Sequence, residues 1–136
     1  MNEKRVGVGI AVIVLEGNKI LLGHRKNNKL CNDTWGLPGG IMEFGETIEQ
    51  AAVRETKEES NIDVTDIEVI SLDNNTFYGN DNITIGTIAK KWSGQIKNTE
   101  PHKCSGWKWF DQDNLPDNIY IPSKRVIDKY KTGRFY

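Results

Sequence analysis

The chain has 136 residues and a formal net charge of −1, a length that suits a single domain, residues 1–136, with its own core. This charge argues against the basic face that broad nucleic-acid binding needs, and no apolar run reaches the roughly 18 residues of a membrane span. Cys31 and Cys104 lie far apart without CxxC spacing, which argues against a disulfide scaffold and a zinc site. We therefore expect a cytoplasmic protein without a membrane or nucleic-acid partner.

The first elements are two strands joined by a tight turn. Residues 6–15 (VGVGIAVIVL) are β-branched and almost continuously apolar, which predicts a strand covered on both faces. Gly17-Asn18 predicts a hairpin turn, and residues 19–26 the returning strand. Residues 27–34 are mostly polar and predict a loop. Residues 35–40 (WGLPGG) then predict a buried tryptophan followed by a break in regular structure.

A helix follows, with signals at both of its ends. Thr47 and Gln50 have the spacing of a capping box at the N-terminus. Asn61 stands where a left-handed residue ends a helix, a position that asparagine accepts. Ala51 and Ala52 share one face, and their small side chains allow close packing on a sheet.

Later residues predict three more strands and a second helix. The strands are residues 67–72, 82–90 and 106–110, with a loop or hairpin tip at 73–82. The second helix covers 122–131, with Pro122 in its first turn and Gly133 after its end. Strands and two helices in this order predict an α/β fold with a mixed β-sheet between helices.

Three glutamates of the first helix form the main candidate site. Glu55, Glu58 and Glu59 stand at i, i+3 and i+4, so their side chains emerge on one face. An all-oxygen ligand set favours Mg²⁺, with Mn²⁺ as a substitute, and the Gly40 carbonyl could reach the same metal. Arg54 points to a different face and could pair with Glu46 or Glu58, holding the loop on the helix. The alternative for these glutamates alone is a solvated helix surface.

The spacing of these residues resembles the signature of the Nudix hydrolase family, G-x5-E-x7-R-E-U-x-E-E-x-G-U, where U is a bulky apolar residue. Residues 40–62 match it from Gly40 through Glu46 and Arg54 to Glu59. Thr56 departs from the aliphatic position, and Asn61 replaces the last glycine. Flanking segments, including LLGHRK, LPGG and EPHKCSGWKWF, are similar to the nucleoside triphosphate diphosphatase branch of the family.

The resemblance implies an α/β/α Nudix sandwich and the hydrolysis of a nucleoside diphosphate linked to another group. It implies Glu55 and Glu59 as principal metal ligands, Glu58 as a further ligand, and Arg54 as the organiser of the catalytic set. It also implies a homodimer. Glu46 and Asn61 are assigned structural roles within the motif.

Residues outside the glutamate cluster have weaker signals. Arg25 could face phosphates from its strand, and the alternative is an ordinary surface charge. Gly39 precedes the predicted metal-binding glycine and joins it as a candidate substrate contact. Glu100 could act as an accessory base or ligand from a late loop, or be a surface carboxylate before Pro101. His24 is expected to be structural or to lie at the substrate's edge.

The leading hypothesis is a Mg²⁺-dependent enzyme that converts (deoxy)nucleoside triphosphates to monophosphate and pyrophosphate. A second enzymatic hypothesis changes the substrate to ADP-ribose, a nucleotide sugar or a dinucleoside polyphosphate. A third is a Nudix module that binds a nucleotide without cleaving it.

Overall fold

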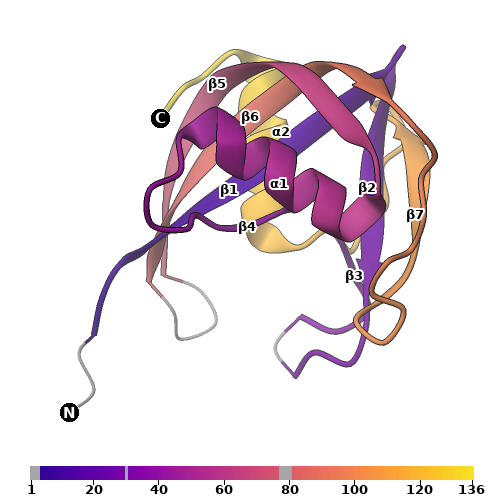
Figure 1. The fold of residues 1–136 in the computed structure, drawn as a ribbon, viewed down its shortest axis with the longest axis horizontal. Coiled ribbons are helices and arrows are strands. Elements are labelled where there is room, and N and C mark those ends of the chain that lie inside the picture. The colour runs from indigo at the N-terminus through magenta and orange to yellow at the C-terminus, as the bar shows by residue number, and fades with distance from the viewer. Residues whose placement is uncertain (1–3, 30, 77–80) are drawn as a thin grey trace.

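The computed structural model describes residues 4–29, 31–76 and 81–136. In this part of the chain two helices and seven strands are arranged as in Figure 1. In chain order they are β1 (Gly7–Glu16), β2 (Lys19–Arg25), β3 (Thr34–Gly36), β4 (Gly39–Ile41), α1 (Ile48–Ser60), β5 (Asp63–Asn75), β6 (Asn82–Ser93), β7 (Cys104–Asp111) and α2 (Ile121–Thr132).

The strands form one mixed sheet in the order β3-β2-β1-β6-β5, with β4 paired to β1 and β7 paired to β2. The β1–β6 pair is parallel over eight residue pairs, and the other pairs are antiparallel. Since β1 pairs with β4 through residues 9–11 and with β2 only at its far end, the sheet splays apart beside β4. The active-site candidates gather at this opening.

Strand β1 joins the two helical layers. Its even residues pack with Ala51 and Ala52 of α1, while its odd residues pack with Val126 and Ile127 of α2. Successive strand residues point to opposite faces of a sheet, so a strand buried on both faces reads as a continuous apolar run. The helices lie on opposite faces of the sheet (Figure 1), and this confirms the predicted α/β/α sandwich.

Both ends of α1 are formed as predicted. The Thr47 hydroxyl accepts from the Gln50 N–H at 3.1 Å, and the Gln50 side chain accepts from the Thr47 N–H at 2.9 Å. Asn61 adopts φ = 68°, and its N–H donates to the Lys57 carbonyl at 3.0 Å. The capping box and the left-handed C-cap therefore hold α1 to its observed length.

Several predicted boundaries change. The WGLPGG segment was expected to break regular structure but forms the short strands β3 and β4, because its backbone pairs with β2 and β1. Trp35 is only partly buried. Strand β5 is much longer than 67–72, because it pairs with β6 along its whole length. The predicted 73–82 loop lies partly within β5, and residues 77–80 lie outside the described residues.

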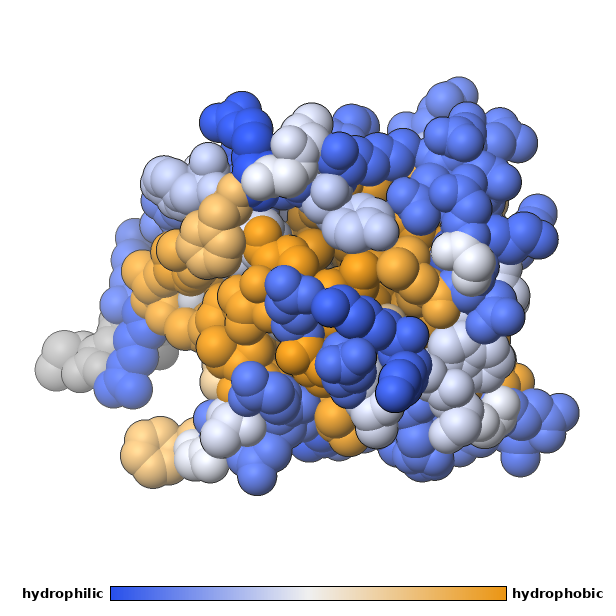
Figure 2. All heavy atoms as spheres, turned by 90° about the horizontal axis from the view of Figure 1, so that it is seen from above, coloured by the Kyte–Doolittle hydropathy of each residue, from blue (hydrophilic) through white to orange (hydrophobic). Residues whose placement is uncertain are grey.

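Strand β5 is at the edge of the sheet and arches over the top of the molecule in Figure 1. Seen from that side, Figure 2 shows an apolar area bordered by hydrophilic side chains. Val69 of β5 is among the exposed large hydrophobic residues. Neither described helix is both long and apolar enough to cross a membrane.

Candidate active site

Two glycines let the β4 backbone lie directly against its neighbours. A Cβ atom on Gly39 would lie 2.0 Å from the Ile10 carbonyl oxygen of β1. A Cβ on Gly40 would lie 2.5 Å from the Glu55 carboxylate of α1. Glycine is therefore required at position 39 by the strand pairing. At position 40 it leaves room for the Glu55 carboxylate beside the backbone.

Arg54 clamps the loop before α1 onto the helix. Its Nε and Nη2 donate to the two carboxylate oxygens of Glu46 at 2.5 and 2.9 Å, and Nη2 also donates to the Ile41 carbonyl at 3.2 Å. The Arg54 hydrogen bond, with help from the Glu43 N–H, lowers the pKa of Glu46 to about 2. The predicted pairing of Arg54 with Glu46 is confirmed.

Arg54 also contacts the glutamates of the predicted metal face. Its Nη1 donates to Glu55 at 2.9 Å and to Glu58 at 3.2 Å. The predicted pairing of Arg54 with Glu58 is confirmed, whereas its contact with the neighbouring Glu55 was not expected from a side chain placed on a different face. Burial raises the pKa of Glu55, and the Arg54 hydrogen bond opposes this rise.

Glu59 occupies the most enclosed position of the three glutamates. Its carboxylate accepts from the Gly39 N–H at 2.7 Å, and its backbone carbonyl accepts from the Trp107 indole at 3.1 Å. Burial is the largest cause that raises the pKa of Glu59 to about 8, and the nearby charges of Glu55 and Glu100 add to it. Glu59 is thus a carboxyl group that holds its proton near neutral pH when no cation is beside it.

A late loop places Glu100 opposite α1. The Thr99 hydroxyl donates to the Glu58 carbonyl and, at 2.9 Å, to the Glu59 carbonyl, while the Lys97 N–H donates to the Ser60 carbonyl at 3.0 Å. These bonds tie the loop to the last turn of the helix. Glu100 is consequently close enough to raise the pKa of Glu59.

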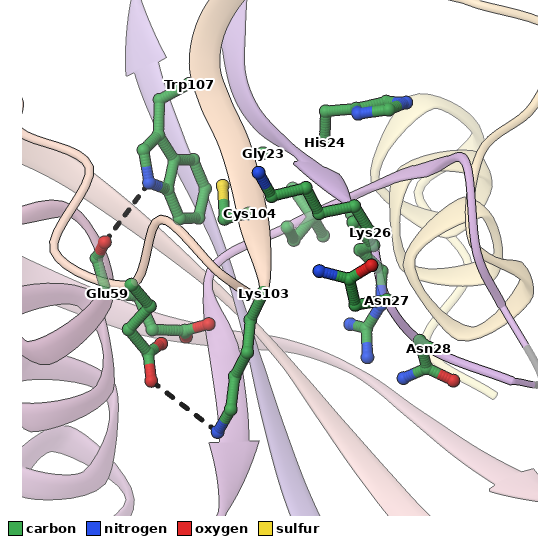
Figure 3. Close-up of a pocket in the computed structure, with 13 residues that line it drawn as sticks. Gly23, His24, Lys26, Asn27, Asn28, Glu59, Lys103, Cys104 and Trp107 are labelled. Atoms are coloured by element: carbon green, nitrogen blue, oxygen red, sulfur yellow. Dashed lines mark hydrogen bonds and ion pairs between the residues drawn. The ribbon is translucent and has the colours of Figure 1, made fainter.

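Two neighbouring hollows meet at these residues. One, the glutamate cleft, has a volume of about 390 Å³ and is lined by Gly39, Gly40, Glu55, Glu58 and Glu59 together with residues of β1, β6 and α2. The other, the basic pocket, has a volume of about 300 Å³ and lies among β2, the loop after β2, and β7 (Figure 3). Both are lined by Arg25, Leu37, Glu59, Glu100 and Lys103.

The donor set of the glutamate cleft suits a hard divalent cation, since it consists of carboxylate and backbone oxygens. Within residues 4–29, 31–76 and 81–136, no three Asp, Glu, His or Cys side chains converge as a ready metal site. Glu55 and Glu58 face Arg54 while Glu59 faces Gly39. Side-chain rotation of these glutamates would therefore accompany cation binding.

A sequence profile of the NUDIX domain family matches residues 3–130. This chain is a Nudix hydrolase.

Relatives of this Nudix hydrolase carry several different names. It is 34% identical over 132 residues to an ADP-ribose pyrophosphatase of Methanocaldococcus jannaschii, covering 93% of this chain and 75% of the relative. It is also 34% identical over 127 residues to a putative 8-oxo-dGTP diphosphatase of Bacillus subtilis, covering 92% and 80%. An NAD-capped RNA hydrolase of Pseudomonas aeruginosa is 29% identical over 126 residues, and the chain spans 42% of its length.

Solved structures agree with the fold of the Nudix hydrolase. A MutT NUDIX hydrolase from Burkholderia pseudomallei superposes with a TM-score of 0.85 at 25% identity, covering 92% of this chain and 98% of that one. The NUDIX domain of Shewanella oneidensis NrtR, solved with ADP-ribose, superposes with a TM-score of 0.76 at 19% identity, covering 96% and 89%. The second likeness shows the fold alone.

Some residues of the site were not predicted from the Nudix hydrolase sequence. Lys103 and Tyr120 line the glutamate cleft from a late loop and from the start of α2, and no local pattern distinguishes either from a surface residue. Cys104 is half-buried and lines the basic pocket. His24, by contrast, was expected to be structural or to lie at the substrate's edge. It lines the same pocket, and its ring contacts Ser105 at 2.5 Å and Asp33 at 2.6 Å.

Proposed function

We propose that this Nudix hydrolase converts (deoxy)nucleoside triphosphates to monophosphate and pyrophosphate with Mg²⁺, or Mn²⁺ in its place. The observation that carries the proposal is the junction of the two hollows. There Glu59 lines both hollows together with Arg25 and Lys103, and Glu55 and Glu58 line the glutamate cleft. The proposed metal-binding oxygens and phosphate-binding cations therefore border one space. Such a junction suits a chain of phosphates better than a neutral ligand.

In this proposal Glu55 and Glu59 are the principal metal ligands, with Glu58 and the Gly40 carbonyl completing the set. Bound Mg²⁺ would neutralise phosphate charge and acidify a coordinated water. Arg54 positions Glu55 and Glu58 through its hydrogen bonds to both. Arg25 and the Gly39 segment face the substrate, and Glu46 and Asn61 keep the loop and the helix end in place.

The reaction adds the oxygen of water to one phosphorus of the phosphoric anhydride. The bond from that phosphorus to the bridging oxygen breaks, and the bridging oxygen leaves with the other phosphate. The proton of the water passes to a carboxylate. One of the three helix glutamates (Glu55, Glu58 or Glu59) accepts this proton, or Glu100 accepts it from the opposite loop, since Glu100 lines both hollows.

The test is product release from a panel of nucleotides with Mg²⁺, comparing the parent with Glu59→Gln. We expect triphosphates to be the best substrates and the variant to lose at least 100-fold in kcat. Exposed Glu49 of the same helix supplies the control Glu49→Gln, which should keep full activity. Equal turnover by Glu59→Gln and the parent would contradict the proposal.

ADP-ribose is the second candidate substrate. It is favoured by the 34% identity to a relative named ADP-ribose pyrophosphatase. The same panel decides between the two, because ADP-ribose yields AMP and ribose 5-phosphate without pyrophosphate. Tight nucleotide binding without product in long incubations would instead indicate a module that binds only.

A further inference from the structure

The basic pocket is a built compartment beside the glutamate cleft. Its two rims are cross-linked, since the Lys26 N–H donates to the Lys103 carbonyl at 2.9 Å and the Asn27 side chain donates to the His102 carbonyl at 2.7 Å. The Trp107 ring forms one wall, directly against Gly23, where an added Cβ would lie 2.8 Å from it. The pocket therefore keeps its shape without a ligand.

Charge in the pocket is unevenly balanced. Arg25, Lys26 and Lys103 contribute three cations, and Glu59 and Glu100 contribute the carboxylates. Lys103 lies 3.7 Å from Glu100, and the Glu59 carboxylate accepts from Gly39. In the described part of the chain neither Arg25 nor Lys26 forms a salt bridge.

The side chains of the two cations lie where an anion could meet them. Lys26 extends from the end of β2 toward the side of the pocket where Cys104 and Trp107 lie (Figure 3). The Arg25 guanidinium lies 4.4 Å from the centre of the Tyr120 ring, and its buried Nε has no hydrogen-bond partner among the described residues. Arg25 lines both hollows, so its positive charge borders an anion placed at their junction.

We infer that the basic pocket holds the pyrophosphate leaving group of the substrate, with Lys26 as its main determinant. This inference rests on the proposed function and specifies which part of the substrate lies in which hollow. The nucleoside monophosphate half occupies the glutamate cleft, and the phosphates beyond the cleaved bond lie against Arg25 and Lys26. A group with several negative charges suits this pocket better than a phosphorylated sugar, whose hydroxyls would face cations.

Calorimetric titration at fixed Mg²⁺ tests the inference, with pyrophosphate and ribose 5-phosphate as probes. We expect pyrophosphate to bind the parent at least tenfold more tightly than ribose 5-phosphate. Lys26→Ala should weaken pyrophosphate binding about tenfold. The matched control is Lys108→Ala, an exposed lysine of β7 that lines neither hollow, and it should bind as the parent does. Lys26→Gln serves as a second variant that keeps most of the side-chain volume.

Two results would overturn the inference: unchanged pyrophosphate affinity in both Lys26 variants, or equal affinity of the parent for the two probes. A kinetic arm separates this inference from the proposed function. If the parent hydrolyses no triphosphate, the proposed function fails while the titration still decides what the pocket binds. If the parent hydrolyses triphosphates, Lys26→Ala should lower kcat/KM for them about tenfold, and Lys108→Ala, which lines neither hollow, should not.

Discussion

Glu59 combines a hydrogen bond from Gly39 with a position that is largely shielded from water. Burial disfavours the charged form of a carboxyl group, which is why its pKa rises to about 8. A divalent cation beside it would reverse this effect, because an opposite charge favours the carboxylate. The protonation state of Glu59 therefore links cation binding to pH.

The pKa of Glu59 predicts how the stability of the metal-free protein changes with pH. Between pH 4.5 and about 8 the folded protein keeps a proton that the unfolded chain releases, so the folded state loses stability as pH rises through this window. Glu59→Gln removes the titration and should melt on the order of 5 °C higher than the parent at pH 8.5. Below pH 4.5 the difference should shrink.

Thermal melts in chelator at pH 4 and pH 8.5 make this comparison, with Glu49→Gln as the control for removing a helix carboxylate. Adding Mg²⁺ at pH 8.5 should raise the melting temperature of the parent more than that of Glu59→Gln. Identical melting curves of parent and Glu59→Gln at both pH values would show that Glu59 is not desolvated.

Alanine substitutions at three glycines test how closely neighbouring atoms approach the backbone, because the added methyl group meets a different neighbour in each variant. In Gly40→Ala the new methyl group displaces the Glu55 carboxylate, the mobile end of a side chain. The variant should fold but lose at least tenfold in activity or in apparent Mg²⁺ affinity. Gly39→Ala meets the Ile10 backbone instead, and it should lose stability as well.

Gly7→Ala is the control, since its methyl group would make only ordinary contact with Ile41 at 3.7 Å. Melting temperature and Mg²⁺-dependent activity of the three variants provide the comparison. A fully active Gly40→Ala would show that the position of the Glu55 carboxylate is unimportant.

At the scale of elements, helix α1 depends on its first turn and on the loop that precedes it. The capping box satisfies two backbone N–H groups that the helix cannot pair itself. Arg54 holds the loop through two hydrogen bonds to Glu46. The cap therefore contributes mainly to stability, and the clamp mainly to the position of Gly40 and the glutamates.

Thr47→Ala should lower the free energy of unfolding by about 1 kcal/mol and change kcat little. Thr47→Ser keeps the hydroxyl and should stay close to the parent. Urea denaturation of the three proteins measures the difference. A loss of activity larger than the loss of folded protein would show that the cap acts on catalysis directly.

In contrast to Thr47→Ala, Arg54→Lys should lower activity more than it lowers stability. A lysine keeps the charge but cannot form the two-pronged contact with Glu46, so the loop should loosen. We expect kcat to fall on the order of 10- to 100-fold, with faster hydrogen exchange at residues 41–46. Arg134→Lys, near the C-terminus and away from both hollows, is the control. Unchanged exchange in the loop would contradict the clamp.

At the scale of the whole molecule, both helical layers are joined through β1. Ile13 is fully buried on the α2 side of that strand, while Val12 is fully buried on the α1 side. The parallel pairing of β1 with β6 brings residues 7–14 beside residues 82–89. Loss of packing on either face should therefore affect the stability of the entire sandwich.

Ile13→Ala should cost about 2–5 kcal/mol of unfolding free energy and leave KM unchanged, because Ile13 faces away from the glutamates. Val69→Ala, at an exposed position of β5, should stay within about 0.5 kcal/mol of the parent. Denaturant curves followed by circular dichroism and by tryptophan fluorescence should coincide for each variant. Separate transitions would show that the layers unfold independently. The homodimer implied by the family resemblance stays a prediction for light scattering.

The local structure of α1 was predictable because its causes lie within a few residues. Capping partners stand three apart in the chain, and the left-handed residue at position 61 ends the helix by its own conformation. The motif spacing likewise predicted the pairing of Arg54 with Glu46, although these two residues stand eight apart. By contrast, β3 and β4 were missed because three-residue strands exist only through pairing with β1 and β2, which no local pattern encodes.

The sequence by itself determined the family, the α/β/α sandwich and the residues of the glutamate set, since periodicity, capping and motif spacing are properties of neighbouring residues. Only the tertiary structure decided what these residues face. Parallel pairing of β1 and β6, the splay beside β4 and the loop tied to the end of α1 bring Arg25, Glu100 and Lys103 to the glutamates. The reason is physical: such contacts join segments tens of residues apart, and they form only when the whole sheet closes.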